Sequence, residues 1–367
     1  MPPDPNPNLK ALRDAGVSIW LDTLSRELLE SGQFADLVRD YSVTGATSNP
    51  AIFAKAISGS DRYDEQLRAA VAAGVTDAKA LFFEIALEDV RRAAELLRPT
   101  YEASGGHDGF ISFECTPDLA DDKDGTVVQA RELWRRLDAP NVMIKVPATE
   151  AGMPAIEQLT ADGVNVNVTL LFSVERYEQV IDAYLSGLER RVAAGEPLDG
   201  IASVASFFVS RVDAKAHAML PTDSPLRGAV AIANAHRAYA RYLQRFTGDR
   251  WNALDALGAR RQRPLWASTG TKDSAFSDVL YVRRLIAPGV INTMPMKTLR
   301  AFADHGIVDP PMDADSSAAE HVLADAAKAG LDLAEIIATL EREGVRSFCS
   351  SYNELLARIR SELPPLG

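Results

Sequence analysis

The feature that most constrains the fold is a regular alternation of short apolar segments with longer helical segments along most of the chain. The short segments are rich in β-branched residues, and the segments between them have helical periodicity. This order is typical of parallel strands joined by right-handed crossovers. Eight strands are predicted, at residues 17–23, 43–47, 110–116, 141–149, 164–171, 201–209, 264–272 and 290–295.

Helical segments fill the intervals between these strands and continue beyond the last one. They are predicted at residues 9–15, 24–37, 60–73, 77–97, 126–137, 153–159, 173–194, 211–245, 278–286, 299–305, 316–329, 333–343 and 352–362. Eight strand–helix units predict a closed (β/α)8 TIM barrel, with an open doubly wound sheet as the alternative. No glycine-rich dinucleotide loop or Walker loop follows a predicted strand, which argues against nucleotide binding. We expect one barrel domain over residues 1–367, with an N-terminal extension at 1–16 and a helical C-terminal region at 299–367.

Composition limits the class of partner. The 367 residues carry a formal net charge of −12, so we expect no nucleic-acid partner and no anionic membrane surface. Cys115 and Cys349 lie far apart, which excludes a disulfide framework and suits a reducing compartment. The first residues lack the regions of a signal peptide, and no apolar run reaches the roughly 18 residues of a membrane span. We therefore expect a cytoplasmic protein without a membrane partner.

Lys145 lies inside a predicted apolar strand, among Val142, Ile144 and Val146. Burying an ammonium group is costly unless the group is paired or neutralised. Two interpretations follow from the strand alone. Lys145 is either a structural lysine that pairs with a carboxylate or extends to solvent, or a functional amine.

Polar side chains recur where the predicted strands end. In the strand at 164–171, Asn165, Asn167 and Thr169 share one face, where they form either a polar layer inside the barrel or contacts to a ligand. The carboxyl ends of the strands build the active sites of TIM barrels, so we expect one shared site there. The strand-end residues are Asp22, Asn49, Glu114, Lys145, Asn167, Ser206 and Ser268. The five histidines lie elsewhere, so neither a histidine-bound metal nor a Ser-His-Asp triad is expected.

A lysine, two acids and two amides suit Schiff-base chemistry without a metal. A neutral lysine amine attacks a ketone, and the resulting imine is an electron sink for cleavage of a carbon–carbon bond. Burial favours the neutral amine, whereas a nearby carboxylate favours the ammonium form. We therefore expect Asp22 and Glu114 to lie some distance from Lys145, or to act on it through water, as proton carriers.

Six segments of the chain resemble the transaldolase family, the Schiff-base enzymes of the pentose phosphate pathway. They are W-L-D-T-L-S-R at 20–26, T-S-N-P-A-I-F at 47–53, V-M-I-K-V-P-A-T at 142–149, G-V-N-V-N-V-T-L-L-F-S at 163–173, S-F-F-V-S-R at 206–211 and A-S-T-G-T-K at 267–272. They stand in the family's order, and the length of the chain resembles the long form. The resemblance implies a circularly permuted class I aldolase barrel with extra helices at both termini, no cofactor and no metal.

The resemblance also implies roles for individual residues. Lys145 would form the Schiff base, Asp22 would take the proton of the C4 hydroxyl, and Glu114 would work through a water held with Thr169. The implied substrate-binding residues are Asn49, Asn167, Ser206, Phe208, Arg211, Ser268 and Lys272. The family often has an arginine two residues after the position of Ser268, where this chain has Gly270. Lys272 either supplies that charge or is an ordinary loop lysine.

The resemblance implies a transferase that acts on small-molecule sugar phosphates. A dihydroxyacetone unit would pass from sedoheptulose 7-phosphate or fructose 6-phosphate to glyceraldehyde 3-phosphate or erythrose 4-phosphate, by a ping-pong route. A second hypothesis is a lyase of the fructose-6-phosphate aldolase type, which releases free dihydroxyacetone. A third, from another class, is a barrel that binds sugar phosphates without catalysis. A monomer or a homodimer is expected.

Overall fold

The structure is a computed structural model that describes residues 5–361. Within these residues, eight parallel strands pair in sequence order and close into one barrel, so the predicted (β/α)8 barrel is confirmed and the open sheet is wrong. The strands are β1 Ser18–Leu21, β2 Val43–Thr47, β3 Ile111–Glu114, β4 Val142–Pro147, β5 Val166–Leu171, β6 Ser203–Phe208, β7 Arg263–Ala267 and β8 Ile291–Met294. Most of them are shorter than predicted, because residues at one or both ends of the predicted segments lie outside the hydrogen-bonded ladder.

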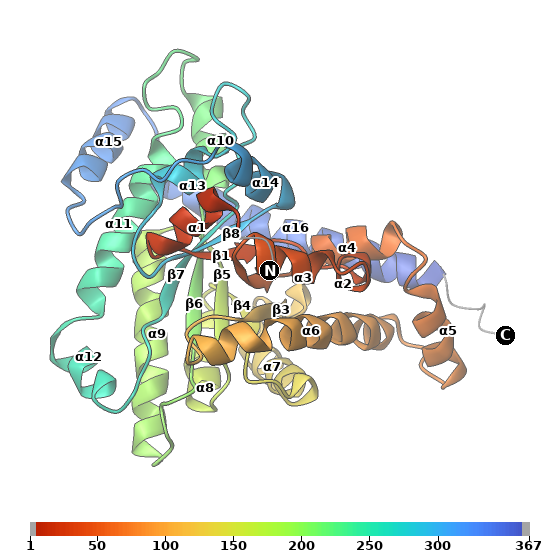
Figure 1. The fold of residues 1–367 in the computed structure, drawn as a ribbon. Helices are drawn as coiled ribbons and strands as arrows, with labels where there is room; N and C mark the ends of the chain where they lie inside the picture. The colour runs from red at the N-terminus through yellow and green to blue at the C-terminus, as the bar shows by residue number, and fades with distance from the viewer. Residues whose placement is uncertain (1–4, 362–367) are drawn as a thin grey trace.

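Helices surround the strands (Figure 1). They are α1 Pro7–Asp14, α2 Arg26–Glu30, α3 Gln33–Asp40, α4 Pro50–Ser58, α5 Asp64–Ala72, α6 Ala78–Ala103, α7 Lys123–Leu137, α8 Gly152–Ala161, α9 Val174–Ala193, α10 Ser210–Met219, α11 Val230–Arg245, α12 Gly248–Asp255, α13 Leu280–Arg284, α14 Met296–His305, α15 Ser317–Lys328 and α16 Leu333–Ser361, with a 3-10 turn, η1, at Pro117–Leu119. No helix within residues 5–361 is long and apolar enough to cross a membrane.

Several predicted helices have the wrong bounds. The segment 24–37 is two helices, α2 and α3, because Gly32 between them adopts a left-handed conformation with φ of 79°. The segment 211–245 is also two helices, α10 and α11, with a loop between them. Helix α4 is not among the predicted helices, although Asn49 caps it and Pro50 occupies its first turn, and α12 is not among them either.

The C-terminal region contains one long helix where two were predicted. Segments 333–343 and 352–362 belong to α16, which is continuous to Ser361; Glu362 lies outside the described residues. Gly344 in the middle of α16 does not end the helix. A Cβ atom at Gly344 would lie 3.0 Å from Leu170 Cδ2 of β5, so the missing side chain lets α16 pass close to the barrel. Figure 1 shows α16 and α4 side by side, and the two helices are in contact.

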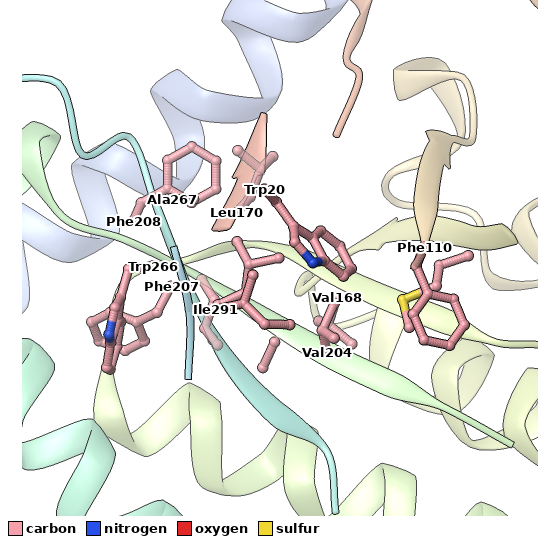
Figure 2. Packing of buried hydrophobic residues seen from close by; sticks show 14 of the residues in the cluster. Trp20, Phe110, Val168, Leu170, Val204, Phe207, Phe208, Trp266, Ala267 and Ile291 are labelled. Atoms are coloured by element: carbon pink, nitrogen blue, oxygen red, sulfur yellow. The ribbon is translucent and has the colours of Figure 1, made fainter. Parts of the chain in front are cut away.

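The strands alternate between an inner and an outer face, as predicted for Ser206 and Phe208. Phe207, between them, packs outward, with its ring 6.3 Å from Tyr177 of α9 and 6.1 Å from Trp266 of β7. Figure 2 shows Phe207 and Trp266 together among the buried residues. Phe208 therefore points to the inside of the barrel, toward the carboxyl ends of the strands.

A cavity of about 520 Å³ lies at the opposite, amino-terminal ends of the strands, lined by Trp20, Val204 and Ile291. Arg263 donates hydrogen bonds to the carbonyls of His107, Gly289 and Val290, at 2.8–3.2 Å. Arg260 donates to the carbonyls of Gly105 and Gly106. These two arginines therefore join loops at this end of the barrel and have few donors left for a ligand.

Candidate active site

A second cavity, of about 300 Å³, opens at the carboxyl ends of the strands, which we call the mouth. The sequence-predicted residues that line it are Asp22, Asn49, Lys145, Thr169, Ser206, Phe208, Arg211, Ser268 and Lys272. Glu114 and Asn167 do not line the mouth; both are buried and join it through hydrogen bonds to residues that do. The structure thus gathers the predicted residues into one place.

Lys145 is buried, with 5% of its surface exposed, and its amine is already paired. Nζ lies 3.1 Å from Glu114 Oε2 and 3.0 Å from the Ser48 carbonyl oxygen. The expectation that Glu114 lies apart from Lys145 or contacts it only through water is therefore wrong. The reason is the register, since Glu114 of β3 and Lys145 of β4 are direct neighbours in parallel strands and share a face. The pairing with a carboxylate that the structural interpretation predicted is present, and a function of the Lys145 amine stays a prediction.

Burial controls the protonation of Glu114. It raises the pKa of the Glu114 carboxyl above its ordinary value, although the charge of Lys145 and the hydrogen bond from Lys145 act in the opposite direction. A carboxylate with a raised pKa is a stronger base. Glu114 is therefore suited to accept a proton from the neighbouring ammonium group and so to release a neutral amine.

Asp22 follows β1 and is only partly buried. Its Oδ1 accepts a hydrogen bond of 2.9 Å from Thr47 Oγ1, which lies 2.8 Å from Thr293 Oγ1. Burial raises the pKa of the Asp22 carboxyl, opposed chiefly by the charge of Lys145 and by the Thr47 hydrogen bond. Asp22 has no direct hydrogen bond to Lys145 among the contacts of residues 5–361, so the predicted separation holds for this acid.

The two asparagines of β5 have different surroundings. Asn165 bonds the main chain, donating to Pro140 and Val142 carbonyls and accepting from the Ala202 amide, so it belongs to a structural polar layer. Asn167 donates to Ser112 Oγ at 2.9 Å and accepts from Ser206 Oγ at 2.7 Å. Since Ser206 lines the mouth, Asn167 is connected to the site through that hydroxyl.

Two hydroxyl groups at the mouth are held in unusual situations. Ser268 has a φ of 56°, a left-handed conformation that is uncommon for a non-glycine residue, and its hydroxyl lies 2.9 Å from Ser210 Oγ. Thr169 Oγ1 is fully buried and has no hydrogen-bond partner within residues 5–361. Buried hydroxyls are normally hydrogen-bonded, so Thr169 is a candidate contact for a substrate or water.

Arg211, on α10, is held by aromatic rings. Its guanidinium carbon lies 5.0 Å from the ring centre of Phe208 and 6.0 Å from that of Phe348 on α16. Burial lowers the pKa of Arg211, whereas Asp22 and Glu114 raise it. It forms no ion pair within the described part of the chain, so its donors remain available to an anionic group at the mouth.

Several residues that line the mouth are not among those predicted from the sequence. Thr47 is the last residue of β2 and Thr293 is the last but one of β8, so the pattern of polar residues at strand ends could have identified both. Lys297 and Thr298 lie in the first turn of α14, just beyond β8. Phe348 comes from α16, and no local sequence signal predicts that this helix reaches the mouth.

A TIM barrel with a buried lysine–carboxylate pair at its carboxyl end defines the class of this protein as a barrel enzyme. The particular family follows from comparison, because the sequence model of the transaldolase/fructose-6-phosphate aldolase family matches residues 19–359. The chain belongs to that family.

Individual relatives agree with this assignment along nearly the whole chain. It is 51% identical to the transaldolase of Saccharopolyspora erythraea, 50% to that of Frankia alni and 49% to that of Thermobifida fusca. These matches cover 97–98% of this chain and 98% of each relative. The protein is a transferase of the transaldolase type, and the predicted class of enzyme is confirmed.

Proposed function

We propose that the chain transfers a dihydroxyacetone unit between sugar phosphates through a Schiff base on Lys145. The observation that carries the proposal is the buried amine of Lys145, held 3.1 Å from Glu114 at a mouth that Asp22 also lines. The proposed donors are sedoheptulose 7-phosphate and fructose 6-phosphate, and the proposed acceptors are glyceraldehyde 3-phosphate and erythrose 4-phosphate. The name of the relatives, transaldolase, supports the same reaction.

In the first step, the neutral amine of Lys145 adds to the donor ketone after Glu114 accepts its proton. A bond forms between Nζ and the carbonyl carbon, and a proton passes from Nζ to the carbonyl oxygen, which becomes a hydroxyl. Return of a proton from Glu114, through a water that Thr169 helps to hold, lets this hydroxyl leave as water and gives the iminium ion. The raised pKa of Glu114 favours the first of these transfers, the uptake of the proton from Lys145.

In the second step, Asp22 takes the proton of the C4 hydroxyl. The bond between C3 and C4 then breaks, its electrons pass to the iminium ion, and an aldose phosphate leaves. The enamine attacks the aldehyde carbon of the acceptor, whose oxygen takes the proton back from Asp22, and hydrolysis frees Lys145. The hydroxyls of Thr47 and Thr293 orient Asp22 for these transfers.

The remaining residues of the mouth are proposed to bind the substrate. Asn49 and Asn167, the latter through Ser206, would hold donor hydroxyls, and Phe208 would form a wall. Arg211 and Ser268 would hold the phosphate with Lys272, since an arginine with free donors suits a phosphate group.

We also propose that residues 1–367 act as one domain, as a monomer or a homodimer in the cytoplasm. Contacts made by the segment around α1 and by α16 support the single domain. Asn6 and Asn8, beside and within α1, donate to the Ala303 carbonyl of α14, and α16 contributes Phe348 to the mouth. Cys115 and Cys349 are free thiols, which suits a reducing compartment.

Borohydride trapping tests the Schiff base. We expect fructose 6-phosphate and borohydride to give a stable adduct that mass spectrometry maps to Lys145. Lys145→Met should give no adduct and lose transfer activity, whereas Lys328→Met, at an exposed position of α15, should behave as wild type. An unmodified Lys145 in an active enzyme would overturn the mechanism. Accumulation of free dihydroxyacetone without an acceptor would instead indicate the lyase.

A further inference from the structure

The mouth is positive in a protein that is strongly negative. Its charged lining residues are the cations Lys145, Arg211, Lys272 and Lys297 and the single carboxylate of Asp22, whereas the whole chain carries a net charge of −12. Lys145 is committed to Glu114. Arg211, Lys272 and Lys297 remain, and each comes from a different strand-end segment, after β6, β7 and β8.

These three cations have no carboxylate partner within the described residues. Arg211 is packed between two rings, and the side-chain amines of Lys272 and Lys297 form no hydrogen bond or ion pair there. Asp273, beside Lys272, does not neutralise it, because its carboxylate lies 2.9 Å from Arg227 and 3.5 Å from His217. The positive charge at the mouth is therefore available to a ligand.

The segments that carry the two lysines are in contact. A Cβ atom at Gly270 would lie 3.4 Å from Thr298 Oγ1 and 3.5 Å from Pro295 Cγ, so the loop after β7 packs directly on the start of α14. Lys297 lies in the first turn of this ten-residue helix, and no side chain caps its amide groups. Thr298 is 96% buried and lines the mouth, and its hydroxyl forms no hydrogen bond within residues 5–361.

We propose that Lys297 is a specificity-determining residue that binds the substrate phosphate together with Lys272 and Arg211. The amide groups of the first turn of α14 and the Thr298 hydroxyl complete this phosphate site. Gly270 carries no side-chain charge, and the segment that contacts it carries Lys297. In this proposal Lys297 supplies the positive charge to the mouth from the neighbouring helix. The proposal rests on the proposed function for the identity of the substrate, but not for the presence of the anion site.

The test compares Lys297→Met and Lys272→Met with Lys328→Met, the exposed lysine of α15 that lies outside the mouth. With saturating donor, kcat/KM is measured for glyceraldehyde 3-phosphate and for unphosphorylated glyceraldehyde. Removal of one charge-assisted contact should lower the preference for the phosphorylated aldehyde by about tenfold, through KM. Lys328→Met should keep the wild-type preference. Equal losses for both aldehydes, or no loss, in Lys297→Met would overturn the proposal.

A binding measurement separates this proposal from the proposed function. Titration calorimetry of wild type with inorganic phosphate does not require Schiff-base chemistry. Weaker phosphate binding by Lys297→Met, by about tenfold, would support the anion site even if Lys145 formed no adduct. Unchanged phosphate affinity in Lys297→Met, with normal trapping on Lys145, would overturn the role of Lys297 and leave the proposed function intact.

Discussion

At the scale of single residues, the geometry of the barrel provides Lys145 with a base. Glu114 and Lys145 are neighbours in the pairing of β3 with β4, so their side chains lie together on the inner face. Transfer of one proton from the amine to the carboxylate removes both charges from a buried environment, which lowers their desolvation cost. A contact that looks like a structural ion pair is therefore also a way to prepare the nucleophile.

The raised pKa of Glu114 predicts the pH dependence of Schiff-base formation. Glu114 accepts a proton only when ionised, and burial raises its pKa above 4.5, so the rate of adduct formation should fall as the pH drops through this raised pKa. Glu114→Gln should remove this acid limb and slow trapping by about 100-fold. The pH dependence of the trapping rate measures both effects.

Asp22→Asn is the matched control for this prediction, since Asp22 is proposed to act only after the imine has formed. The variant should keep the acid limb of trapping but lose transfer to an acceptor. An unchanged acid limb in Glu114→Gln would show that another group controls the protonation of Lys145.

At the scale of secondary structure elements, a buried polar cluster fixes the segment that follows Asp22. Arg26, at the start of α2, donates to Asp89 of α6 at 2.7 Å, and the side chains are 5% and 0% exposed. Tyr63 OH donates to the same carboxylate at 3.0 Å. Burial raises the pKa of Asp89, opposed first by the charge of Arg26, so the ionised form depends on this arginine. The cluster joins the helices behind β1 and β2.

Removing the arginine should be strongly destabilising. Arg26→Met leaves Asp89 buried without its counter-charge, which typically costs about 3–5 kcal/mol of unfolding free energy. Urea denaturation measures the change. The double variant Arg26→Met/Asp89→Leu should recover part of the loss, and Arg39→Met, which breaks an exposed ion pair, should leave stability close to wild type. Equal effects of Arg26→Met and Arg39→Met would contradict this account.

At the scale of the whole molecule, the last helix completes a site built mainly by the barrel. α16 passes β5 at Gly344 and brings the ring of Phe348 to Arg211. The guanidinium group of Arg211 therefore lies near two rings, those of Phe208 and Phe348. The C-terminal helix therefore takes part in positioning a residue that is proposed to bind phosphate.

Loss of this ring should weaken phosphate recognition. A cation–π contact contributes about 0.5–2 kcal/mol, so Phe348→Leu should raise KM for glyceraldehyde 3-phosphate by roughly two- to thirtyfold. Phe348→Tyr keeps the ring and should stay near wild type. Steady-state kinetics with both aldehydes, together with thermal melting, measures the effect. A similar rise in KM for unphosphorylated glyceraldehyde would indicate a general disturbance of the mouth.

The sequence predicted the barrel and most of the site, because both depend on local patterns. Strand-end residues such as Ser206 are marked by alternation along the chain, and closure of eight parallel strands brings them together. Contacts between distant segments were not predictable in this way. The direct pairing of Glu114 with Lys145 depends on strand register, and the position of Phe348 depends on the packing of α16.

The cavity at the amino-terminal ends of the strands has a practical consequence for use of the protein as a biocatalyst. Its walls include Ala202 and Ala259, small residues at the far end of the barrel from Lys145. Larger apolar side chains at these positions would grow into free volume and add packing where no reacting group lies. Thermal robustness can therefore be engineered from one end of the barrel while substrate scope is varied at the other.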